Sequence, residues 1–311
     1  MLIEGLVKLE DGYIEMIAEI CFIIVTFNGE NWIKECIGSI KELGSVLVVD
    51  NNSSDYTISL IENTFPFVQL IKLNENIGFG KANNIGIRKA IKDKYEYIFL
   101  LNQDAKWFSG SVVEMVRILR NNRKIGILSP LHLSSNKKDL DYLFYRYLNP
   151  FDAPSVISDA IRKELNDIYE VKFINAAAWL VPSKIFIEHG MFHPIFTHYG
   201  EDYEFSSRLK KAGYLSFLYT KASIVHDRPQ VASGNAYVFN SKLIVQRFLR
   251  DFLIKGKVKH SEFAFRVTKN IFGAIINGSV KHLPEIMVVT LGFYFKLNQL
   301  RKISKDHFFI N

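Results

Sequence analysis

The sequence predicts an α/β protein with a mostly parallel central sheet flanked by helices. Short apolar runs rich in β-branched residues alternate with stretches whose apolar residues recur every three or four positions, which indicates strands alternating with amphipathic helices. Several runs stop abruptly on polar residues, as at residues 97–104, where an apolar segment ends in Asn-Gln-Asp. Strands this apolar are typical of parallel sheets covered on both faces, and such sheets bind ligands beyond the carboxyl ends of their strands.

Two units of strand, loop and helix open the predicted sheet. The β-branched run over residues 20–25 continues into Thr-Phe-Asn-Gly, and apolar residues at helical spacing follow over residues 32–40. A second run, residues 46–49, ends on Asp50 and a cluster of turn formers and helix-capping residues. We therefore expect two neighbouring strands that carry polar side chains at their carboxyl ends.

A loop with two glycines follows the third predicted strand, residues 68–73, and leads into a helix that continues to about Ala90. Gly78 and Gly80 form a G-x-G pair, but the third glycine of the dinucleotide-binding fingerprint falls on Asn83, and the loop follows the third strand rather than the first. A nicotinamide-binding enzyme is therefore poorly supported. Glycines and amides at the start of a helix still suit the close approach of an anionic or sugar group.

The fourth predicted strand delivers the Asn-Gln-Asp of residues 102–104 to the edge of the sheet, where ligand chemistry is expected. The alternative is a polar turn before a helix capped by Ser109 or Ser111. The carboxylate of Asp104 becomes a candidate site residue only in combination with the other polar clusters of the chain.

Beyond this point the pattern predicts a helix over residues 112–119 and a strand over residues 125–128. Residues 130–170 are irregular and rich in aromatic residues, so we expect a mobile loop that binds an acceptor, with a plain surface excursion as the alternative. Residues 171–181 indicate a strand pair or a bend, with small residues where another group passes close by.

A second polar cluster lies near residue 200. Glu201 and Asp202 open a predicted helix whose later residues are apolar at helical spacing. The helix dipole alone explains acids in a first turn, but two adjacent acids after an aromatic loop also suit a general base. Two strands, residues 214–219 and 222–225, then lead to His226, which is either a ligand or a hydrogen-bonded polar residue.

The composition suits a globular protein with a large core, since 48% of the 311 residues are hydrophobic and 23% are charged. Cys21 and Cys36 fall on a predicted strand and on the apolar face of a predicted helix, which favours core residues in a reducing compartment over a disulfide or metal site. No N-terminal segment resembles a secretory signal, so we expect a cytoplasmic protein.

The net charge of +7 is concentrated near the C-terminus, where residues 236–311 contain 13 Lys and Arg against 4 Asp and Glu. Such a region can face nucleic acid, anionic lipid or an acidic partner, and its aromatic and aliphatic content favours a lipid surface. Its apolar runs of about ten residues are half the length of a spanning helix. We therefore expect attachment to the inner face of the membrane, with a helical cap on the main domain as the alternative.

Five motifs occur in an order that resembles one enzyme family. They are Ile-Val-Thr-Phe-Asn in the first strand, Val-Val-Asp-Asn-Asn-Ser-Ser-Asp in the second, Asn-x-Asn-x-Gly-Phe-Gly-x-Ala-Asn-Asn-x-Gly, Leu-Leu-Asn-Gln-Asp, and Gly-Glu-Asp-x-x-x-x-x-Arg-Leu. Over roughly residues 20–228 the chain resembles the inverting family-two nucleotide-sugar glycosyltransferases of GT-A fold. It looks most like their bacterial rhamnosyltransferase branch.

The resemblance implies a role for each matching residue. Asp202 matches the general base, and Glu201 a residue that orients the acceptor. Asp104 and His226 match ligands of a divalent metal, Mg or Mn, on the donor diphosphate. Asp50 matches the carboxylate that binds the pyrimidine ring, and the full set matched to nucleotide and donor sugar is Thr26, Asn28, Asp50, Asn52, Asn74, Gly78, Asn83, Asn102 and Gln103.

One position departs from the family pattern, because the first acid of the D-x-D motif is Asn102 here. A carboxylate is a stronger ligand for a hard cation than an amide oxygen, so weak metal binding without nucleotide is expected. The departure also supports an alternative, a catalytically inactive, membrane-associated binding protein with the same fold.

The resemblance implies inverting transfer of a sugar, rhamnose first, from a nucleoside-diphosphate sugar to a hydroxyl of a saccharide or lipid-linked saccharide in cell-surface polysaccharide synthesis. The expected division is an N-terminal extension over residues 1–19, a GT-A domain over 20–235 and a basic helical appendage over 236–311. No nucleic-acid partner is expected because no recognition motif is present. A homodimer is left open.

Overall fold

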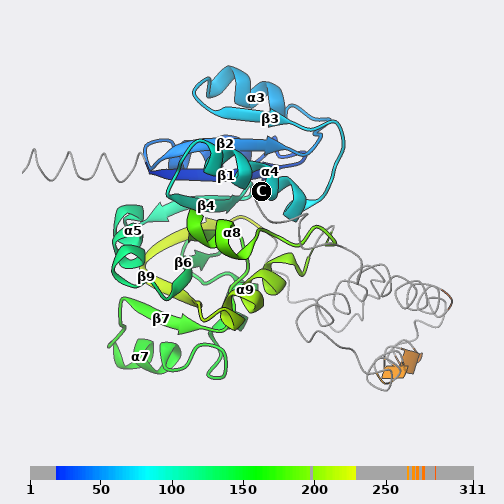
Figure 1. Ribbon diagram of the computed structural model, residues 1–311. Coiled ribbons are helices and arrows are strands. Elements are labelled where there is room, and N and C mark those ends of the chain that lie inside the picture. Colours follow the sequence, from blue (N-terminus) through cyan, green and yellow to red (C-terminus); the bar gives the residue numbers. More distant parts are fainter. Residues whose placement is uncertain are drawn as a thin grey trace, which may run out of the picture.

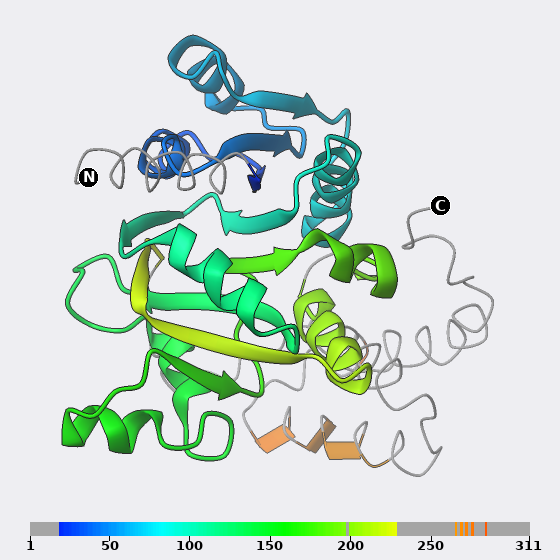
Figure 2. The same ribbon diagram turned by 60° about the vertical axis from the view of Figure 1, so that its left-hand side comes forward.

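In a computed structural model of the protein, residues 19–196 and 199–228 are described, together with a few helical positions between 265 and 284. This part of the chain forms one nine-stranded sheet in the order β3-β2-β1-β4-β8-β6-β9-β5, with β7 paired to β9 outside that path. Figures 1 and 2 show helices on both sides of the sheet, with β3 and α3 at one end of the molecule and β7 and α7 at the other.

The strands are β1 Ile20–Thr26, β2 Ser45–Asp50, β3 Gln69–Lys72, β4 Tyr97–Asn102, β5 Ala105–Ser109, β6 Ile125–Leu133, β7 Ile168–Val171, β8 Ala178–Pro182 and β9 Leu215–His226. The helices are α2 Ile33–Ile40, α3 Thr57–Thr64, α4 Phe79–Lys92, α5 Val112–Asn121, α6 Tyr142–Tyr145, the 3-10 helix η1 Arg146–Leu148, α7 Val156–Arg162, α8 Ser183–His189 and α9 Glu201–Lys211.

The prediction of an α/β fold with a helix-flanked central sheet is confirmed, but the sheet is parallel in only one half. Strands β3, β2, β1 and β4 pair in parallel, as the alternating pattern predicted. In the other half, β8 runs antiparallel to β4 and β6, and β9 is antiparallel to β5 and β7 while parallel to β6. The sheet is therefore mixed rather than mostly parallel, because an apolar run indicates burial without indicating strand direction.

Side chains that alternate along the central strands pack into two separate cores. Phe22 and Phe99 face one core, where their rings stack with centroids 4.8 Å apart beside apolar residues of α2, α3 and α5. Ile23 and Leu100 face the other core, formed with α4, α8 and α9. Complete burial of such a side chain contributes about 1.5–3 kcal/mol, so these strands hold the carboxyl edge of the sheet rigidly.

Helix α4 lies unusually close to the sheet because Gly86 faces it. A methyl group added at Gly86 would lie 2.7 Å from Cγ2 of Ile23 and 3.3 Å from Cγ2 of Val49, so a larger side chain would push the helix outward. The close packing fixes the helix start, at Gly78 and Phe79, beside the carboxyl ends of β1 and β2. The predicted third strand, loop and helix are confirmed.

Several predicted boundaries were wrong. Residues 130–170 are only partly irregular, since β6 continues to Leu133 and this segment also holds α6, η1, α7 and most of β7. A small core that includes Phe144 supports it. The two strands expected over residues 214–225 form the single strand β9, whose pairing with β6 is irregular between Tyr219 and Ser223, and β5 was not predicted. Ser111 does cap α5, accepting a hydrogen bond from the backbone of Glu114.

All but residue 19 of the predicted extension over residues 1–19, and almost all of the predicted appendage over residues 236–311, lie outside the described residues. Within the described part, no helix combines the length and apolar character that crossing a membrane requires. Cys21 and Cys36 are buried free thiols, as expected for core residues.

Candidate active site

One cavity of about 1010 Å³ opens at the carboxyl ends of the central strands, between the start of α4 and the start of α9. Its lining includes Val25 from β1, Asn51 after β2 and Arg228 after β9. Seven of the thirteen residues singled out in the sequence also line it, namely Gly78, Asn102, Gln103, Asp104, Glu201, Asp202 and His226. Sequence positions more than 100 residues apart therefore share one site.

Asp104 and His226 form a close pair on the cavity wall. Oδ1 of Asp104 lies 3.2 Å from Nε2 of His226, whose side chain is 1% exposed against 27% for Asp104. The register of the sheet imposes this proximity, because Ala105 at the start of β5 pairs with His226 at the end of β9. The backbone N–H of Asp227 also donates to the carbonyl of Asp104 at 2.7 Å.

The distance between Asp104 and His226 suits either a hydrogen bond or two ligands of one cation. Ligands about 2.1 Å from an ion, at nearly right angles, lie about 3 Å apart. Two residues before Asp104, Oδ1 of Asn102 is buried without a hydrogen-bond partner. No group of three or more His, Cys, Asp or Glu side chains suited to a metal occurs among residues 19–196 and 199–228. Asp104 and His226 therefore fit an ion for which they are the two strong ligands. The remaining ligands of that ion would come from other groups.

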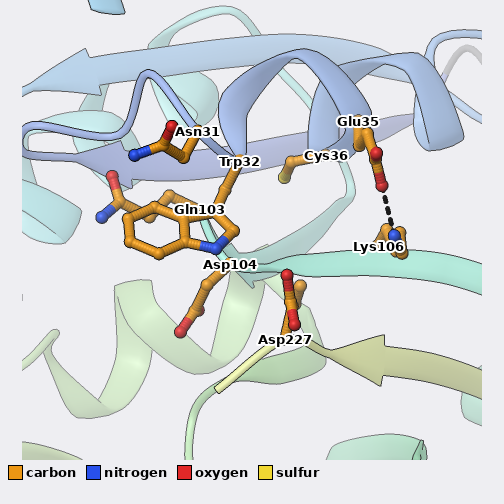
Figure 3. Close-up of a pocket in the computed structure, with 9 residues that line it drawn as sticks. Asn31, Trp32, Glu35, Cys36, Gln103, Asp104, Lys106 and Asp227 are labelled. Atoms are coloured by element: carbon orange, nitrogen blue, oxygen red, sulfur yellow. Dashed lines mark hydrogen bonds and ion pairs between the residues drawn. The ribbon is translucent and has the colours of Figure 1, made fainter. Parts of the chain in front are cut away.

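Behind Asp104 lies a second, much smaller cavity of about 40 Å³ under the first turn of α2. Figure 3 shows Trp32 and Asp227 on its two sides, with an ion pair between Glu35 and Lys106 at one end. One water molecule needs about 10–15 Å³ on this measure, so this cavity has room for a few waters and is far smaller than the large cavity. Substrate chemistry at Asp104 therefore belongs to the large cavity.

Gln103 supports the loop after β1. Its Oε1 accepts hydrogen bonds from Oγ1 of Thr26 at 2.7 Å and from the backbone of Phe27 at 3.0 Å. A methyl group at Gly29 would lie 2.4 Å from the same oxygen, so the loop closes tightly over the amide. Gln103 lines the cavity, yet its carbonyl oxygen already accepts the two hydrogen bonds that link the ends of β1 and β4.

Glu201 and Asp202 open α9, as predicted, but their environments differ. Glu201 is 4% exposed, and its Oε2 is buried without a partner, whereas Asp202 is only half-buried. Burial, reinforced by the negative charge of Asp202, raises the pKa of Glu201 to about 8. Glu201 therefore keeps its proton at neutral pH.

Arg208 fixes the start of α9 through Glu204 and the preceding loop. Its guanidinium donates to both carboxylate oxygens of Glu204, at 2.9 and 3.0 Å, and to the carbonyls of His189, Gly190 and Met191. Arginine is suited to this because its planar fork carries several donors in fixed directions. The spacing between Gly-Glu-Asp and Arg208 thus has a structural basis that the sequence did not reveal, with Arg208 as a positioning residue.

Asn84 is a second positioning residue that the sequence analysis did not single out. Its Nδ2 donates to the carbonyl of Phe192 at 2.7 Å, and its Oδ1 accepts from the backbone N–H of Phe192 at 2.9 Å. The pair ties α4 to the segment before α9. The sequence did not indicate this role, because helical periodicity does not identify the hydrogen-bond partner of a buried asparagine.

Three aromatic rings pack in a row near Asp202, and of these Tyr147 lines the cavity. Tyr147 packs edge-on against Phe173 with centroids 5.1 Å apart, and Phe173 lies 5.0 Å from the ring of Tyr203 in the first turn of α9. Burial, and secondly the charge of Asp202, raises the pKa of Tyr147 to about 12. Tyr147, from the segment predicted to bind an acceptor, therefore lies within the electrostatic reach of Asp202.

Arg228 links the end of β9 to residues 130–170, the segment that contains Tyr147. Its Nε donates to Oδ2 of the fully buried Asp141 at 2.7 Å, and Oδ1 of Asp141 caps α6 by accepting from the backbone of Phe144 at 2.8 Å. His132 stacks on Phe144, and burial lowers its pKa, with His226 as a further cause, so its ring is neutral.

Four of the residues matched to nucleotide and donor sugar, namely Thr26, Asn28, Asp50 and Asn52, do not line the cavity. Thr26 and Asp50 are 0% exposed, and Oδ2 of Asp50 accepts from the backbone of Ser53 at 2.9 Å while its Oδ1 is unpaired. Asn28 and Asn52 adopt left-handed backbone conformations, which asparagine tolerates well. Oδ1 of Asn28 accepts from the backbone N–H of Ser54, joining the loops after β1 and β2.

In the glycine loop, Gly78 lines the cavity with φ of +88°, a conformation that favours glycine. Asn74 is exposed outside the cavity, and Asn83 is buried, donating to the carbonyl of Phe79 within α4. Two residues that were not predicted line the cavity instead. Nδ2 of Asn51 donates to Oδ1 of Asn76 at 2.8 Å, which joins the loops after β2 and β3.

Comparison with known proteins agrees with this geometry. Residues 21–190, more than half of the chain, match the family model of glycosyl transferase family 2. The chain belongs to glycosyl transferase family 2. Its α/β architecture is that of the GT-A glycosyltransferases, as the motifs implied.

Two similar relatives of this family 2 member are bacterial rhamnosyltransferases. The N-acetylglucosaminyl-diphospho-decaprenol L-rhamnosyltransferase of Mycobacterium tuberculosis is 26% identical over 204 residues, which cover 59% of this chain and 66% of the relative. The dTDP-rhamnosyl transferase RfbF of Shigella flexneri is 28% identical over 123 residues, covering 39% of this chain and 41% of the relative. The match thus spans slightly less than two thirds of the first relative's length.

Solved structures of glycosyltransferases share the fold at low sequence identity. GalNAc-T7 with UDP, GalNAc and Mn2+ superposes with a TM-score of 0.59 at 15% identity, over 87% of this chain and 54% of that chain. S. aureus TarS 1-349 in complex with UDP-GlcNAc gives a TM-score of 0.53 at 15% identity, over 92% of this chain and 76% of that chain.

Proposed function

We propose that the protein is an inverting glycosyltransferase that moves a sugar from a nucleoside-diphosphate donor to a hydroxyl of a saccharide or lipid-linked saccharide. The observation that carries this proposal is that one cavity is lined both by Asp104 and His226 and by Glu201 and Asp202. A single displacement needs both kinds of group at one reaction centre, one to hold the departing diphosphate and one to take the proton of the attacking hydroxyl.

The donor diphosphate would lie between Asp104, His226 and the amino end of α4. Gly78 lines this part of the cavity, and the amino end of a helix favours an anion because its dipole is positive there. Asp104 and His226 would hold a Mg or Mn ion, which when bound stabilises the negative charge that develops on the diphosphate.

Asp202 would act as the general base toward the acceptor hydroxyl. Burial raises the pKa of Glu201 and favours its protonated form, so the half-buried Asp202 is the better candidate for the base. A positioned base contributes roughly 10²- to 10⁴-fold to the rate. The protonated Glu201 would help to orient the acceptor.

Rhamnose on deoxythymidine diphosphate is the first donor to test, and a lipid-linked saccharide the first acceptor. The name of the M. tuberculosis relative includes a lipid diphosphate acceptor, and that of RfbF includes dTDP-rhamnose. Tyr147, which lines the cavity and packs against Phe173, supports a saccharide acceptor because its ring offers an apolar surface and its hydroxyl a polar group. The corresponding setting is polysaccharide synthesis at the inner face of the membrane.

A thermal-shift screen followed by a transfer assay tests the proposal. The donors are dTDP-rhamnose, UDP-galactofuranose and UDP-N-acetylglucosamine, each with and without Mn or Mg. We expect one donor to raise the melting temperature, because ligands that bind only the folded state stabilise it, and the same radiolabelled donor to yield product. A donor that binds without transfer or hydrolysis would favour an inactive binding protein. Binding of no donor would refute the proposal.

A further inference from the structure

Four residues that line the large cavity carry a buried polar atom without a hydrogen-bond partner in the described part of the chain. These atoms are Oδ1 of Asn102, Oδ1 of Asn175, Oε2 of Glu201 and Nδ1 of His226. Buried polar groups in native proteins are nearly always paired. These are half of the eight such side-chain atoms in the described part of the chain, so a ligand bound in this one cavity is a candidate partner for them.

Asn102 and Asn175 lie on neighbouring segments that line this cavity. Together with Glu201 they form the part of the lining that we call its floor. The backbone N–H of Asn102 donates to the carbonyl of Ala177 at 2.9 Å, so the residues before β8 run beside the end of β4. Ala176 and Ala177 line the cavity between the two asparagines. Their short side chains leave room there for a ring with polar substituents.

Glu201, the third residue of this floor, lies against the start of α4. A methyl group added at Gly80 would lie 3.3 Å from Cγ of Glu201, so the first turn of α4 packs directly against this acid. The floor therefore lies between the glycine loop, where the donor diphosphate is proposed, and the helix that carries Asp202. The transferred sugar must occupy the space between those two groups.

The chemistry of the unpaired atoms narrows the choice of ligand group. An amide oxygen accepts hydrogen bonds, so its partner must be a donor or, for Asn102 beside the proposed metal site, a cation. The oxygens of a diphosphate are acceptors at neutral pH and do not meet this need, whereas each hydroxyl of a sugar can donate.

We propose that Asn175 accepts a hydrogen bond from a hydroxyl of the transferred sugar and thereby helps to select the donor. The inference rests on the proposed function, because it requires a nucleotide sugar in this cavity. It assigns a role to a residue outside the five sequence motifs.

The test compares a bare nucleotide with its sugar-bearing form on the same variants. Isothermal titration calorimetry gives the Kd of dTDP and dTDP-rhamnose, with UDP and UDP-N-acetylglucosamine as a second pair, for wild type, Asn175→Leu and Asn175→Asp. Leu removes the acceptor at nearly constant volume, while Asp keeps an acceptor oxygen. We expect Asn175→Leu to weaken the sugar nucleotide about 3- to 10-fold with the Kd of the bare nucleotide unchanged. Asn175→Asp should keep the wild-type ratio of the two Kd values.

Asn121→Leu, at an exposed position at the end of α5, is the matched control and should change neither Kd. Where Asn175→Leu fails to fold by circular dichroism, Asn175→Ala removes the same oxygen. An unchanged Kd ratio in the folded variant, or an equal loss for both ligands, would overturn the role of Asn175. A wild type that binds neither sugar nucleotide would instead refute the proposed function, so the two failures are distinguishable.

Discussion

Replacing Glu201 by Gln should make the stability of the protein less dependent on pH while sugar transfer continues. Glu201 is 4% exposed in the folded protein, and burial beside Asp202 raises the pKa of its carboxyl group from 4.5 to about 8. Between these two values the folded protein retains a proton that the unfolded chain releases. The contribution of Glu201 to stability is therefore complete below about pH 4.5 and is lost as the pH rises toward 8.

The size of the effect follows from the same shift. Each pH unit inside this window costs at most about 1.4 kcal/mol, so Glu201 should lower the free energy of unfolding by up to about 3 kcal/mol between pH 5 and pH 7. Gln has nearly the same shape and does not titrate. Glu201→Gln should lack this loss and be more stable than wild type at pH 7.

Urea unfolding at pH 5, 6, 7 and 8 measures the difference, with Glu170→Gln, at an exposed position on β7, as the control. The control should follow the wild-type pH profile. Parallel profiles for wild type and Glu201→Gln would refute the raised pKa of Glu201. Loss of transfer in Glu201→Gln by a factor of 10² or more would move the general base from Asp202 to Glu201.

Three further substitutions probe the rest of the site. Asp202→Asn should leave donor affinity nearly intact while transfer falls by roughly 10² or more, and turnover close to wild type on the same preparation would exclude Asp202 as the base. Asp104→Ala should abolish transfer and remove any gain in nucleotide affinity caused by Mn or Mg, measured by calorimetry, so a gain that persists would remove Asp104 from the proposed metal site. Arg208→Ala should lower the free energy of unfolding in urea by about 3–5 kcal/mol, because it leaves the buried Glu204 unpaired, and a loss below about 1 kcal/mol would contradict the positioning role.

The parallel half of the fold could be predicted from the sequence because its signals are local. The apolar runs of β1, β2 and β4 and the polar residues that end them stand next to each other in the chain. The antiparallel half could not be predicted in the same way. The direction of β8 and the pairing of β5 with β9 depend on contacts between distant residues, which periodicity does not report.

Single side chains of the site show the same limit. A strand ending in Asn-Gln-Asp indicates a polar edge, but an amide can bind a ligand or the backbone equally well. Gln103 uses its oxygen to hold the loop after β1, while Oδ1 of Asn102 is left unpaired at the cavity. Asn84 and Arg208 were missed because their partners are backbone groups of a distant loop, whose positions only the folded chain defines.

The placement of β7 makes the segment between β6 and β7 suitable for exchange between homologues. β7 pairs with β9 outside the main strand order, so residues 134–167 leave and rejoin the sheet without interrupting the ladder that carries Asp104. Lengthening a surface segment costs little, only about 0.6 kcal/mol for each doubling. A chimera with another family member's segment here would change the surroundings of Tyr147, and it should keep Asp141 so that Arg228 retains its partner at the cavity. One scaffold could in this way acquire new acceptors over evolutionary time or in directed evolution.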